Sequence, residues 1–276
     1  MLSPTQDQIP VSIINLARAG ERRRRMEASL GELGIRFSIL PAVDGSQLSP
    51  EVRTTLQVGP CLRDYGRALS ANEIACVASY LKVLQSIADG PDPYVCVLED
   101  DASPTPMFAS ALSRRWLDTL PQFDILRLVS QPYRLKKSPY VPVANLERHD
   151  VVAPVHAGFL ATGQIITRDS AARLLAKLVP VTAPIDNMLY RDPVIPLRVL
   201  EMRPGVVLDA CHVSQMDGRS EFIQRARQDR RPRDVVRRIA FKEMSRLKDW
   251  RTFIGFWGLK SVFAMRWPFF VQSGLG

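Results

Sequence analysis

The chain has 276 residues, and its hydrophobic content of 46% supports a sizeable core and excludes a globally disordered protein. This length allows one large α/β domain, or one domain with an appendage. The net charge of +9 arises entirely in the C-terminal part, because residues 1–218 carry 23 basic and 23 acidic side chains, whereas residues 219–276 carry 14 basic and 5 acidic ones. We therefore expect a main domain over 1–218 and a basic region over 219–276 that has an anionic partner.

The first elements predict a strand, a helix and a second strand. Residues 10–16 and 35–40 have the composition of strands, and residues 19–33 carry apolar side chains at helical spacing among many arginines. Gly34 is a plausible cap at the end of this helix. A strand, a helix and a strand within about 35 residues are typical of a parallel sheet, so we expect a Rossmann-type, mostly parallel α/β fold.

The rest of the main domain continues this alternation. Residues 70–89 form a strongly amphipathic pattern that predicts a helix, capped by Ser70 or Asn72. Residues 130–151 are less regular, and we expect a loop over the site there. The remaining predicted elements are strands at 123–129 and 159–167, helices at 108–120 and 169–178, and two short β-like runs within 194–207.

One apolar run ends abruptly in three carboxylates. Residues 94–98 are apolar or aromatic, and Glu99, Asp100 and Asp101 follow them. Such a run fits a strand buried on both faces, and open α/β sheets build their sites at the carboxyl ends of strands. Three carboxylates there repel one another unless a cation lies among them, and hard oxygen ligands suit Mg²⁺ or Mn²⁺, which commonly bridges to a diphosphate. The run predicts a metal-dependent enzyme with a nucleotide-diphosphate substrate; an acidic loop after a strand fits it about equally.

Several segments of residues 10–210 carry a family resemblance through their order and spacing. They are Ile14-Asn15-Leu16 with Arg18, Arg22 and Met26; Ala42-Val43-Asp44-Gly45; residues 72–80; Leu98-Glu99-Asp100-Asp101; Ile165-Ile166-Thr167-Arg168; and Pro184-Ile185-Asp186. Together they resemble glycosyltransferase family 25, which includes bacterial lipopolysaccharide galactosyltransferases and collagen galactosyltransferases. The chain departs from the family pattern where Asn72 and Ala75 replace glycines and Tyr80 replaces a histidine.

The resemblance implies a GT-A fold, a UDP-sugar donor and a divalent metal, Mn²⁺ or Mg²⁺. Glu99 and Asp101 match the outer residues of the family's DxD-like motif, and alternate residues of an extended backbone point the same way. We expect these two carboxylates to hold the metal, with Asp101 as the first ligand. Asp100 then points elsewhere, toward the ribose or a neighbouring amide.

The donor is expected to lie along the edge where the first two strands end. Asn15 and Arg18 follow the first strand, and Arg22 is placed to contact phosphate, since arginine pairs with such oxygens in a bidentate way. Asp44 ends the second strand and is a candidate for a ribose hydroxyl. The alternatives are a solvated basic helix face for the arginines, and a turn residue for Asp44.

Two further carboxylates are candidate catalytic residues. Asp186 is our candidate general base, because an inverting transfer needs a carboxylate near the acceptor hydroxyl; a helix cap is an equally good role for it. Glu73 lies beside the apolar stripe of its helix, where it contacts donor or acceptor or simply complements the helix N-terminus. His212 is a candidate third metal ligand, although a satisfied polar histidine is the more common case.

The basic region predicts a long amphipathic helix from residue 234 onward. Its apolar stripe is Val236, Ala240, Met244, Leu247, Trp250 and Ile254. Basic residues with Trp and Phe fit an anionic membrane surface, and a stripe packed on the main domain is compatible with this. No nucleic-acid motif accompanies the charge. The four cysteines show no CxxC pairing, and neither a signal peptide nor a membrane span is predicted, so we expect a cytoplasmic protein, peripheral on the inner face of the cytoplasmic membrane.

The predicted function is transfer of a sugar from a UDP-sugar to a hydroxyl of a lipopolysaccharide, lipooligosaccharide or other surface glycan precursor. The resemblance implies that the sugar is galactose. A membrane partner would suit an acceptor that is linked to a lipid. If the family is followed, the anomeric centre inverts. One alternative is a noncatalytic, membrane-associated binding protein that retains the fold, which the changes at Asn72, Ala75 and Tyr80 favour. The other alternative is a metal-dependent phosphoryl-transfer enzyme. The sequence has no GxxxxGK[ST] phosphate-binding loop, which argues against it.

Overall fold

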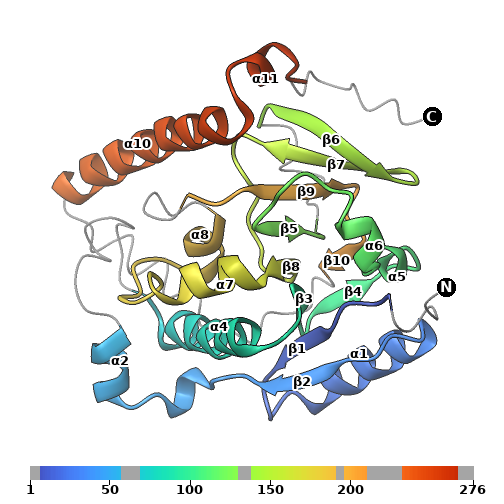
Figure 1. Cartoon of the computed structure of the whole chain (residues 1–276). Coiled ribbons are helices and arrows are strands. Elements are labelled where there is room, and N and C mark those ends of the chain that lie inside the picture. The colour runs from blue at the N-terminus through green and yellow to red at the C-terminus, as the bar shows by residue number, and fades with distance from the viewer. Residues whose placement is uncertain (1–6, 57–68, 130–137, 191–195, 210–231, 267–276) are drawn as a thin grey trace, which may run out of the picture.

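The computed structural model describes residues 7–56, 69–129, 138–190, 196–209 and 232–266. Within these ranges the chain forms an eight-stranded sheet in the order β2-β1-β3-β8-β5-β9-β7-β6, with helices on both faces (Figure 1). The strands of this sheet are β1 (Val11–Asn15), β2 (Ser38–Pro41), β3 (Tyr94–Glu99), β5 (Ile125–Arg127), β6 (Tyr140–Leu146), β7 (His149–Pro154), β8 (Gly163–Thr167) and β9 (Val199–Arg203). A second sheet pairs β4 (Ala102–Pro104) with β10 (Val207–Asp209).

Helices fill most of the connections. They are α1 (Gly20–Glu32), α2 (Pro50–Leu56), α4 (Ala71–Asp89), α5 (Phe108–Ala111), α6 (Arg114–Leu117), α7 (Arg168–Leu175), α8 (Ile185–Tyr190), α10 (Pro232–Trp257) and α11 (Lys260–Phe263), with a 3₁₀ turn, η1, at Gly45–Gln47. None of the described helices is both long and apolar enough to cross a membrane.

The mostly parallel sheet is confirmed. β1 pairs in parallel with β2 and β3, and β5 pairs in parallel with β9, whereas β8 and β7 run antiparallel to their neighbours. The carboxyl ends of β1, β2 and β3 therefore meet at one edge, which is where an open α/β sheet places its site.

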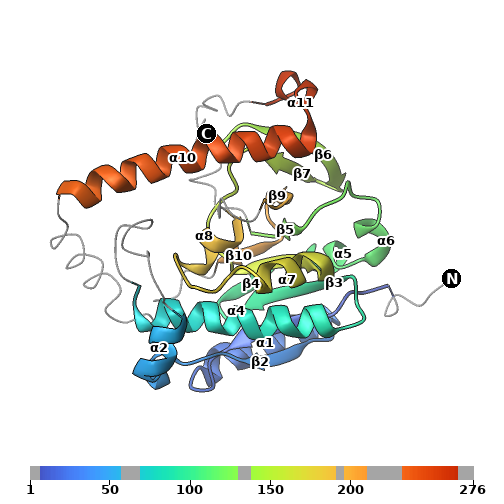
Figure 2. The same cartoon turned by 60° about the vertical axis from the view of Figure 1, so that its left-hand side comes forward.

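The sheet is buried on both faces, as the continuous apolar run of β3 predicts. Cys96 and Leu98 face a core built with α1, α5 and α6, whereas Val95 and Val97 face a second core built with α4, α7 and α8. Figure 2 shows α4 and α7 side by side in front of the sheet. Residues of both cores are almost entirely excluded from water, so each face of the sheet is covered by its own layer of packed side chains.

Local signals account for the ends of two helices. Ser70 begins α4 with a capping box, in which its Oγ accepts from the Glu73 backbone N–H and the Glu73 carboxylate accepts from the Ser70 N–H. Gly34 follows α1 with a φ of +66°, a left-handed conformation that favours glycine.

Two predicted elements are wrong. The helix expected over 108–120 is two short helices, because Ser113 leaves the helical conformation and caps α6 through the Trp116 N–H. The irregular stretch expected over 130–151 contains β6 and much of β7, which form a hairpin with a bulge near Pro142. Residues 130–137 lie outside the described part of the chain.

The second half of α10 packs on the main domain. Phe253 is buried in the core, Trp250 and Ile254 pack against it, and Asp249 Oδ2 lies 2.6 Å from His156 Nδ1. The first half extends beyond the hairpin in both views (Figures 1 and 2). The boundary expected at residue 218 lies outside the described residues.

Candidate active site

The first cluster joins the ends of β1 and β3. These strands are in register with Ile14 opposite Glu99, so Asn15 and Asp100 come next to each other. The Asn15 Nδ2 donates to Asp100 Oδ2 at 2.8 Å, and an Arg22 guanidinium nitrogen lies 3.1 Å from Asp100 Oδ1. The structure thus brings together three predicted donor-binding residues. The Asp100 carboxylate is engaged with Asn15 and Arg22, in keeping with the prediction that Asp100 contacts a neighbouring amide.

Glu99 lies among other carboxylates. Burial, and then the negative charges of Asp101, Asp186 and Asp100, raise the pKa of Glu99 to about 8. Two catalytic or metal-site candidates that are 87 positions apart in the sequence, Glu99 and Asp186, are therefore close enough in space to repel each other.

Asp101 is the carboxylate with unmet hydrogen-bonding capacity. Its Oδ1 is buried and has no hydrogen-bond partner among the described residues. Burial, followed by the charges of Asp100 and Asp209, raises its pKa above the ordinary value. Asp209 reaches this position because β10 pairs with β4, which sets Asp209 opposite Ala102. A buried, unpaired oxygen among like charges is costly unless a cation or a donor compensates it.

These carboxylates fit a hard divalent cation in chemistry and charge. Among the described residues, no group of three or more His, Cys, Asp or Glu is arranged so that it could hold a metal ion. Glu99 and Asp101 are the residues that would hold it, and diphosphate oxygens and water are the ordinary remaining ligands of Mg²⁺. His212, a candidate third ligand, lies outside the described residues.

The other two predicted donor-binding residues, Arg18 and Asp44, pair near the end of β2. Arg18 Nε donates to Asp44 Oδ2 at 2.8 Å, and Asp44 Oδ1 accepts from the Ser46 N–H at 2.9 Å. Hydrogen bonds from Ser46 and then from Arg18 lower the pKa of Asp44. The next residue, Gly45, packs closely against the start of α4. A Cβ at this position would lie 2.2 Å from the Asn72 side chain and 2.7 Å from the Asn72 backbone nitrogen, so only glycine fits.

The two catalytic candidates differ in what the structure gives them. The Glu73 carboxylate is engaged in the capping box of α4, which is the helix-end role weighed above. Asp186 lies in the first turn of α8, where its Oδ1 accepts from the Asn187 N–H at 2.9 Å, and it also faces Glu99. Contact of either residue with a substrate stays a prediction.

Sequence reasoning missed a buried chain of polar side chains beside Glu99. The Tyr80 hydroxyl lies 3.4 Å from Glu99 Oε1 and donates to the Ala161 carbonyl at 2.7 Å. Gln164 Nε2 donates to the Tyr80 oxygen at 3.1 Å, and Gln164 Oε1 accepts from the Tyr190 hydroxyl. A polar residue in the apolar strand β8 was the available signal, but only the fold shows that Tyr80 and Tyr190 are its partners.

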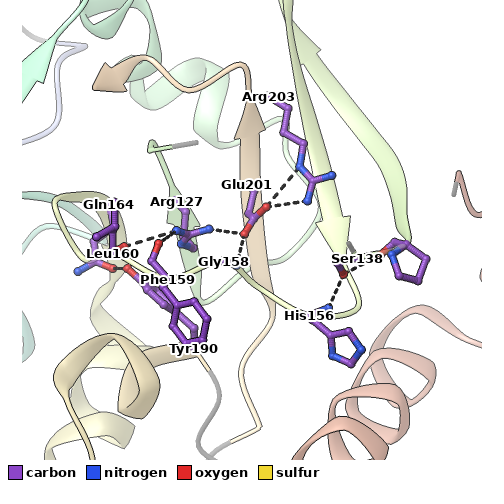
Figure 3. A network of polar contacts seen from close by, with 11 residues as sticks. Arg127, Ser138, His156, Gly158, Phe159, Leu160, Gln164, Tyr190, Glu201 and Arg203 are labelled. Carbon is purple, nitrogen blue, oxygen red and sulfur yellow. Dashed lines mark hydrogen bonds and ion pairs between the residues drawn. The ribbon is translucent and has the colours of Figure 1, made fainter. Parts of the chain in front are cut away.

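This series of polar side chains continues from Tyr190 to a buried ion pair. The Arg127 guanidinium lies 4.8 Å from the Tyr190 ring and pairs with Glu201, and it donates to the Phe159 carbonyl (Figure 3). Burial opposes ionisation of Glu201, but Arg127 and Arg203 hold its pKa below the ordinary value. The pair fixes the segment before β8, whose Thr162 carbonyl accepts from the Glu99 N–H at 2.9 Å.

Comparison with known proteins identifies the family. The model of glycosyltransferase family 25 (LPS biosynthesis protein) matches residues 8–189, which hold nearly all of the carboxylate cluster. The chain belongs to glycosyltransferase family 25. The resemblance inferred from the motifs is thereby confirmed.

Some of the family 25 relatives are named as glycosyltransferases, and others are named as inactive family members. A glycosyltransferase 25 family member of Drosophila melanogaster is 31% identical over 198 residues, covering 66% of this chain and 31% of the relative. Human procollagen galactosyltransferase 2 is 26% identical over 196 residues, 67% of this chain and 31% of the relative. The human inactive glycosyltransferase 25 family member 3 is 34% identical over 108 residues, 38% of this chain and 18% of the relative.

This chain thus spans about a third of the length of the first two of these relatives. Among solved structures, a glycosyltransferase involved in the glycosylation of the major capsid of PBCV-1 is similar with a TM-score of 0.42 at 10% identity, covering 79% of this chain and 99% of that chain.

Proposed function

We propose that this family 25 glycosyltransferase moves galactose from UDP-galactose to a sugar hydroxyl of a lipopolysaccharide or lipooligosaccharide precursor, with a divalent metal. The observation that carries the proposal is the buried Oδ1 of Asp101, which has no hydrogen-bond partner among the described residues and lies near the carboxylates of Asp100 and Asp209. The description of the family as LPS biosynthesis proteins supports the acceptor, and a relative named procollagen galactosyltransferase supports the sugar.

The leaving group of this reaction is UDP, on which negative charge develops as the glycosidic bond breaks. Mn²⁺ or Mg²⁺ held by Glu99 and Asp101 would supply the positive charge that stabilises it. Arg22, Asn15 and Asp100 form the wall behind these residues, and the Arg18–Asp44 pair lies at the end of β2, where a ribose hydroxyl has both a donor and an acceptor.

Asp186 is proposed as the general base. Its charge lies within interaction range of Glu99, so a hydroxyl near Asp186 is also near the proposed metal. In the proposed step the Asp186 carboxylate takes the hydroxyl proton while the hydroxyl oxygen bonds to the anomeric carbon on the face opposite UDP. The bond from that carbon to the UDP oxygen breaks, which inverts the anomeric centre. We assign Glu73 only a supporting role, through the position of α4.

The test is a panel of UDP-sugars assayed against total membrane glycolipid, with transfer of labelled sugar as the readout. Asp101→Asn is expected to lower transfer by at least about a hundredfold, in line with the loss of one ligand or charge in a metal site. Asp150→Asn changes an exposed carboxylate in β7 and is the matched control. Full transfer by Asp101→Asn would contradict the metal assignment.

The membrane is the proposed partner of the basic C-terminal region over 219–276, and we place the enzyme at the inner face of the cytoplasmic membrane. Four large apolar side chains of α10 that precede Asp249 are exposed, namely Val236, Ile239, Met244 and Leu247. Arg246 and Lys248 lie beside them. An exposed apolar face with basic neighbours fits an anionic lipid surface, and a lipid-linked acceptor would be met there.

A noncatalytic binding protein with the same fold is the second candidate. Relatives named inactive family members favour it, as does the loss of the family's usual residues at Asn72, Ala75 and Tyr80. Hydrolysis of UDP-galactose, measured with and without Mn²⁺, separates the two. Binding of UDP without any metal-dependent hydrolysis or transfer would favour the second candidate.

A further inference from the structure

A small crevice lies between α8 and the second half of α10. It has a volume of about 50 Å³, and the rings of Tyr190, Phe256 and Trp257 line it together with the polar side chains of Asp249 and Thr252. Both views show α8 beneath α10 (Figures 1 and 2). Since a single water needs about 10–15 Å³, the crevice admits several waters, or one edge of a pyranose ring whose other edge stays in solvent.

The walls of this crevice are held in place. The ring of Tyr190 lies against the Arg127 guanidinium, which is itself fixed by Glu201, as Figure 3 shows. On the opposite wall, the Arg198 guanidinium lies 4.6 Å from the centre of the Phe256 ring. Rings whose positions are fixed before binding lose little entropy when a ligand packs on them.

The crevice lies beside the proposed reaction centre. Tyr190 is in the same short helix as Asp186, one turn later, and the charges of Asp186 and Glu99 both act on its hydroxyl. Three polar contacts lead from Tyr190 through Gln164 and Tyr80 to Glu99. A ligand on the Tyr190 ring is therefore connected to the carboxylate cluster through these contacts, without occupying the position proposed for the metal.

The lining selects among ligand classes. Aromatic rings pack against the C–H face of a sugar, and a carboxylate and a hydroxyl accept from its hydroxyl groups. The Asp249 carboxylate is partly buried and is oriented by His156, at 2.6 Å. Its charge disfavours a phosphate, and an acyl chain would offer no hydrogen bond to Asp249 or Thr252.

We propose that this crevice is an acceptor subsite, which binds one sugar residue of the acceptor glycan through the Tyr190, Phe256 and Trp257 rings and the Asp249 and Thr252 side chains. The inference rests on the proposed glycosyl transfer and gives the acceptor a place. It assigns to α10 a part in acceptor recognition that is separate from its exposed apolar half.

The test is saturation-transfer NMR of the full chain with methyl glycosides of galactose, glucose, mannose and N-acetylglucosamine, beside calorimetry with UDP and Mn²⁺. Ring protons of at least one glycoside are expected to show saturation transfer. Thr252→Val and Asp249→Asn are expected to weaken this binding by about tenfold, as for the loss of a hydrogen bond to a sugar, and to leave the UDP affinity unchanged. Thr54→Val, in the exposed helix α2, and Asp150→Asn are the matched controls.

The outcomes separate the two proposals. Absence of glycoside binding while UDP binds, or glycoside binding that neither Thr252→Val nor Asp249→Asn weakens, would overturn the subsite. Saturation of the alkyl protons of octyl glucoside in preference to its ring protons would overturn it in favour of an acyl-chain site. Glycoside binding that depends on these residues, in a protein without UDP affinity, would uphold the crevice and contradict the proposed transfer.

Discussion

The three adjacent carboxylates do different work because their surroundings differ. Asp100 is held between Asn15 and Arg22, so it has two partners of its own. Asp101, one residue later, keeps a buried oxygen without a hydrogen-bond partner in the described structure. The motif therefore combines a central residue that joins two strands and an outer residue whose oxygen is available to a cation.

This difference predicts opposite effects of two similar substitutions in the metal-free protein. Burial raises the pKa of Asp100 as well, but Asp100→Asn removes its ion pair with Arg22 and the carboxylate that accepts from Asn15, so it is expected to lower the free energy of unfolding by about 1–3 kcal/mol. Asp101→Asn relieves repulsion by Asp100 and Asp209 and is expected to leave stability unchanged or raise it. Urea unfolding in the presence of a chelator measures both, and equal destabilisation by the two would contradict the division of roles.

Glu99 predicts how stability changes with pH. Its folded pKa, about 8, lies above the ordinary value of 4.5, so the folded state binds more protons than the unfolded state between these two values. Stability of the metal-free protein is therefore expected to fall as pH rises from about 5 to 8, and Glu99→Gln is expected to remove part of this fall. Thermal unfolding of both proteins at pH 5.5 and pH 8 measures it. An identical pH dependence in the variant would contradict the raised pKa.

At the scale of elements, the site depends on close approaches that only glycine allows. Gly158 is a second case beside Gly45, because a Cβ there would lie 2.6 Å from an Arg127 guanidinium nitrogen. The same residue donates its N–H to Glu201 Oε1 at 2.6 Å. The connection from β7 to β8 is thus built around the buried ion pair, and that connection ends next to Glu99.

Gly158→Ala is expected to destabilise the protein by about 1–3 kcal/mol, because the Arg127–Glu201 pair must shift within a well-packed interior. The matched control is Gly255→Ala in α10, where a Cβ meets no atom within 4 Å. Alanine in an exposed helix is favoured by about 1 kcal/mol, so this control is expected to be neutral or stabilising. Equal effects of the two substitutions in urea unfolding would contradict the packing argument.

Sequence patterns predicted the elements whose signals are local. The apolar run of β3 and the amphipathic stripe of α4 were visible without partners, and so was a cap at Ser70 or Asn72, of which the structure uses Ser70. The β6–β7 hairpin was missed because Pro142 and mixed charge hide its alternation, and the break at Ser113 was missed because apolar spacing continues through it.

The predicted site residues from the ends of β1, β2 and β3 lie together because parallel strands share an edge. Asp209 and Gln164 could not be found in the same way. Asp209 reaches Asp101 through the pairing of β10 with β4, and Gln164 acts through Tyr80 and Tyr190, which are distant in the chain. Such contacts depend on register, which a single sequence does not contain.

At the scale of the whole molecule, α10 has two halves with different surroundings. Its second half packs on the main domain through Phe253 and Trp250. The part that precedes Asp249 exposes apolar side chains, with Leu247 at 71% and Val236 at 67% exposed. The same helix is therefore placed both to line the crevice beside the site and to present an apolar face outward.

This arrangement predicts reversible binding to anionic vesicles. Leu247→Ser combined with Met244→Ser is expected to weaken sedimentation with phosphatidylglycerol vesicles severalfold, and higher salt is expected to weaken binding of the native protein, since it screens the basic side chains. Val52→Ser, at an exposed apolar residue of α2, is the control. Vesicle binding that is unchanged by both the double variant and salt would contradict a membrane role of this face.

The central claim is that Glu99 and Asp101 hold a divalent metal to which the diphosphate of the donor binds. Calorimetric titration of UDP into the protein, with Mn²⁺ and with a chelator, tests it most directly. We expect UDP affinity that requires Mn²⁺, that is lost in Asp101→Asn and Glu99→Gln, and that persists in Asp150→Asn. Metal-dependent UDP binding of native affinity in the first two variants would contradict the claim.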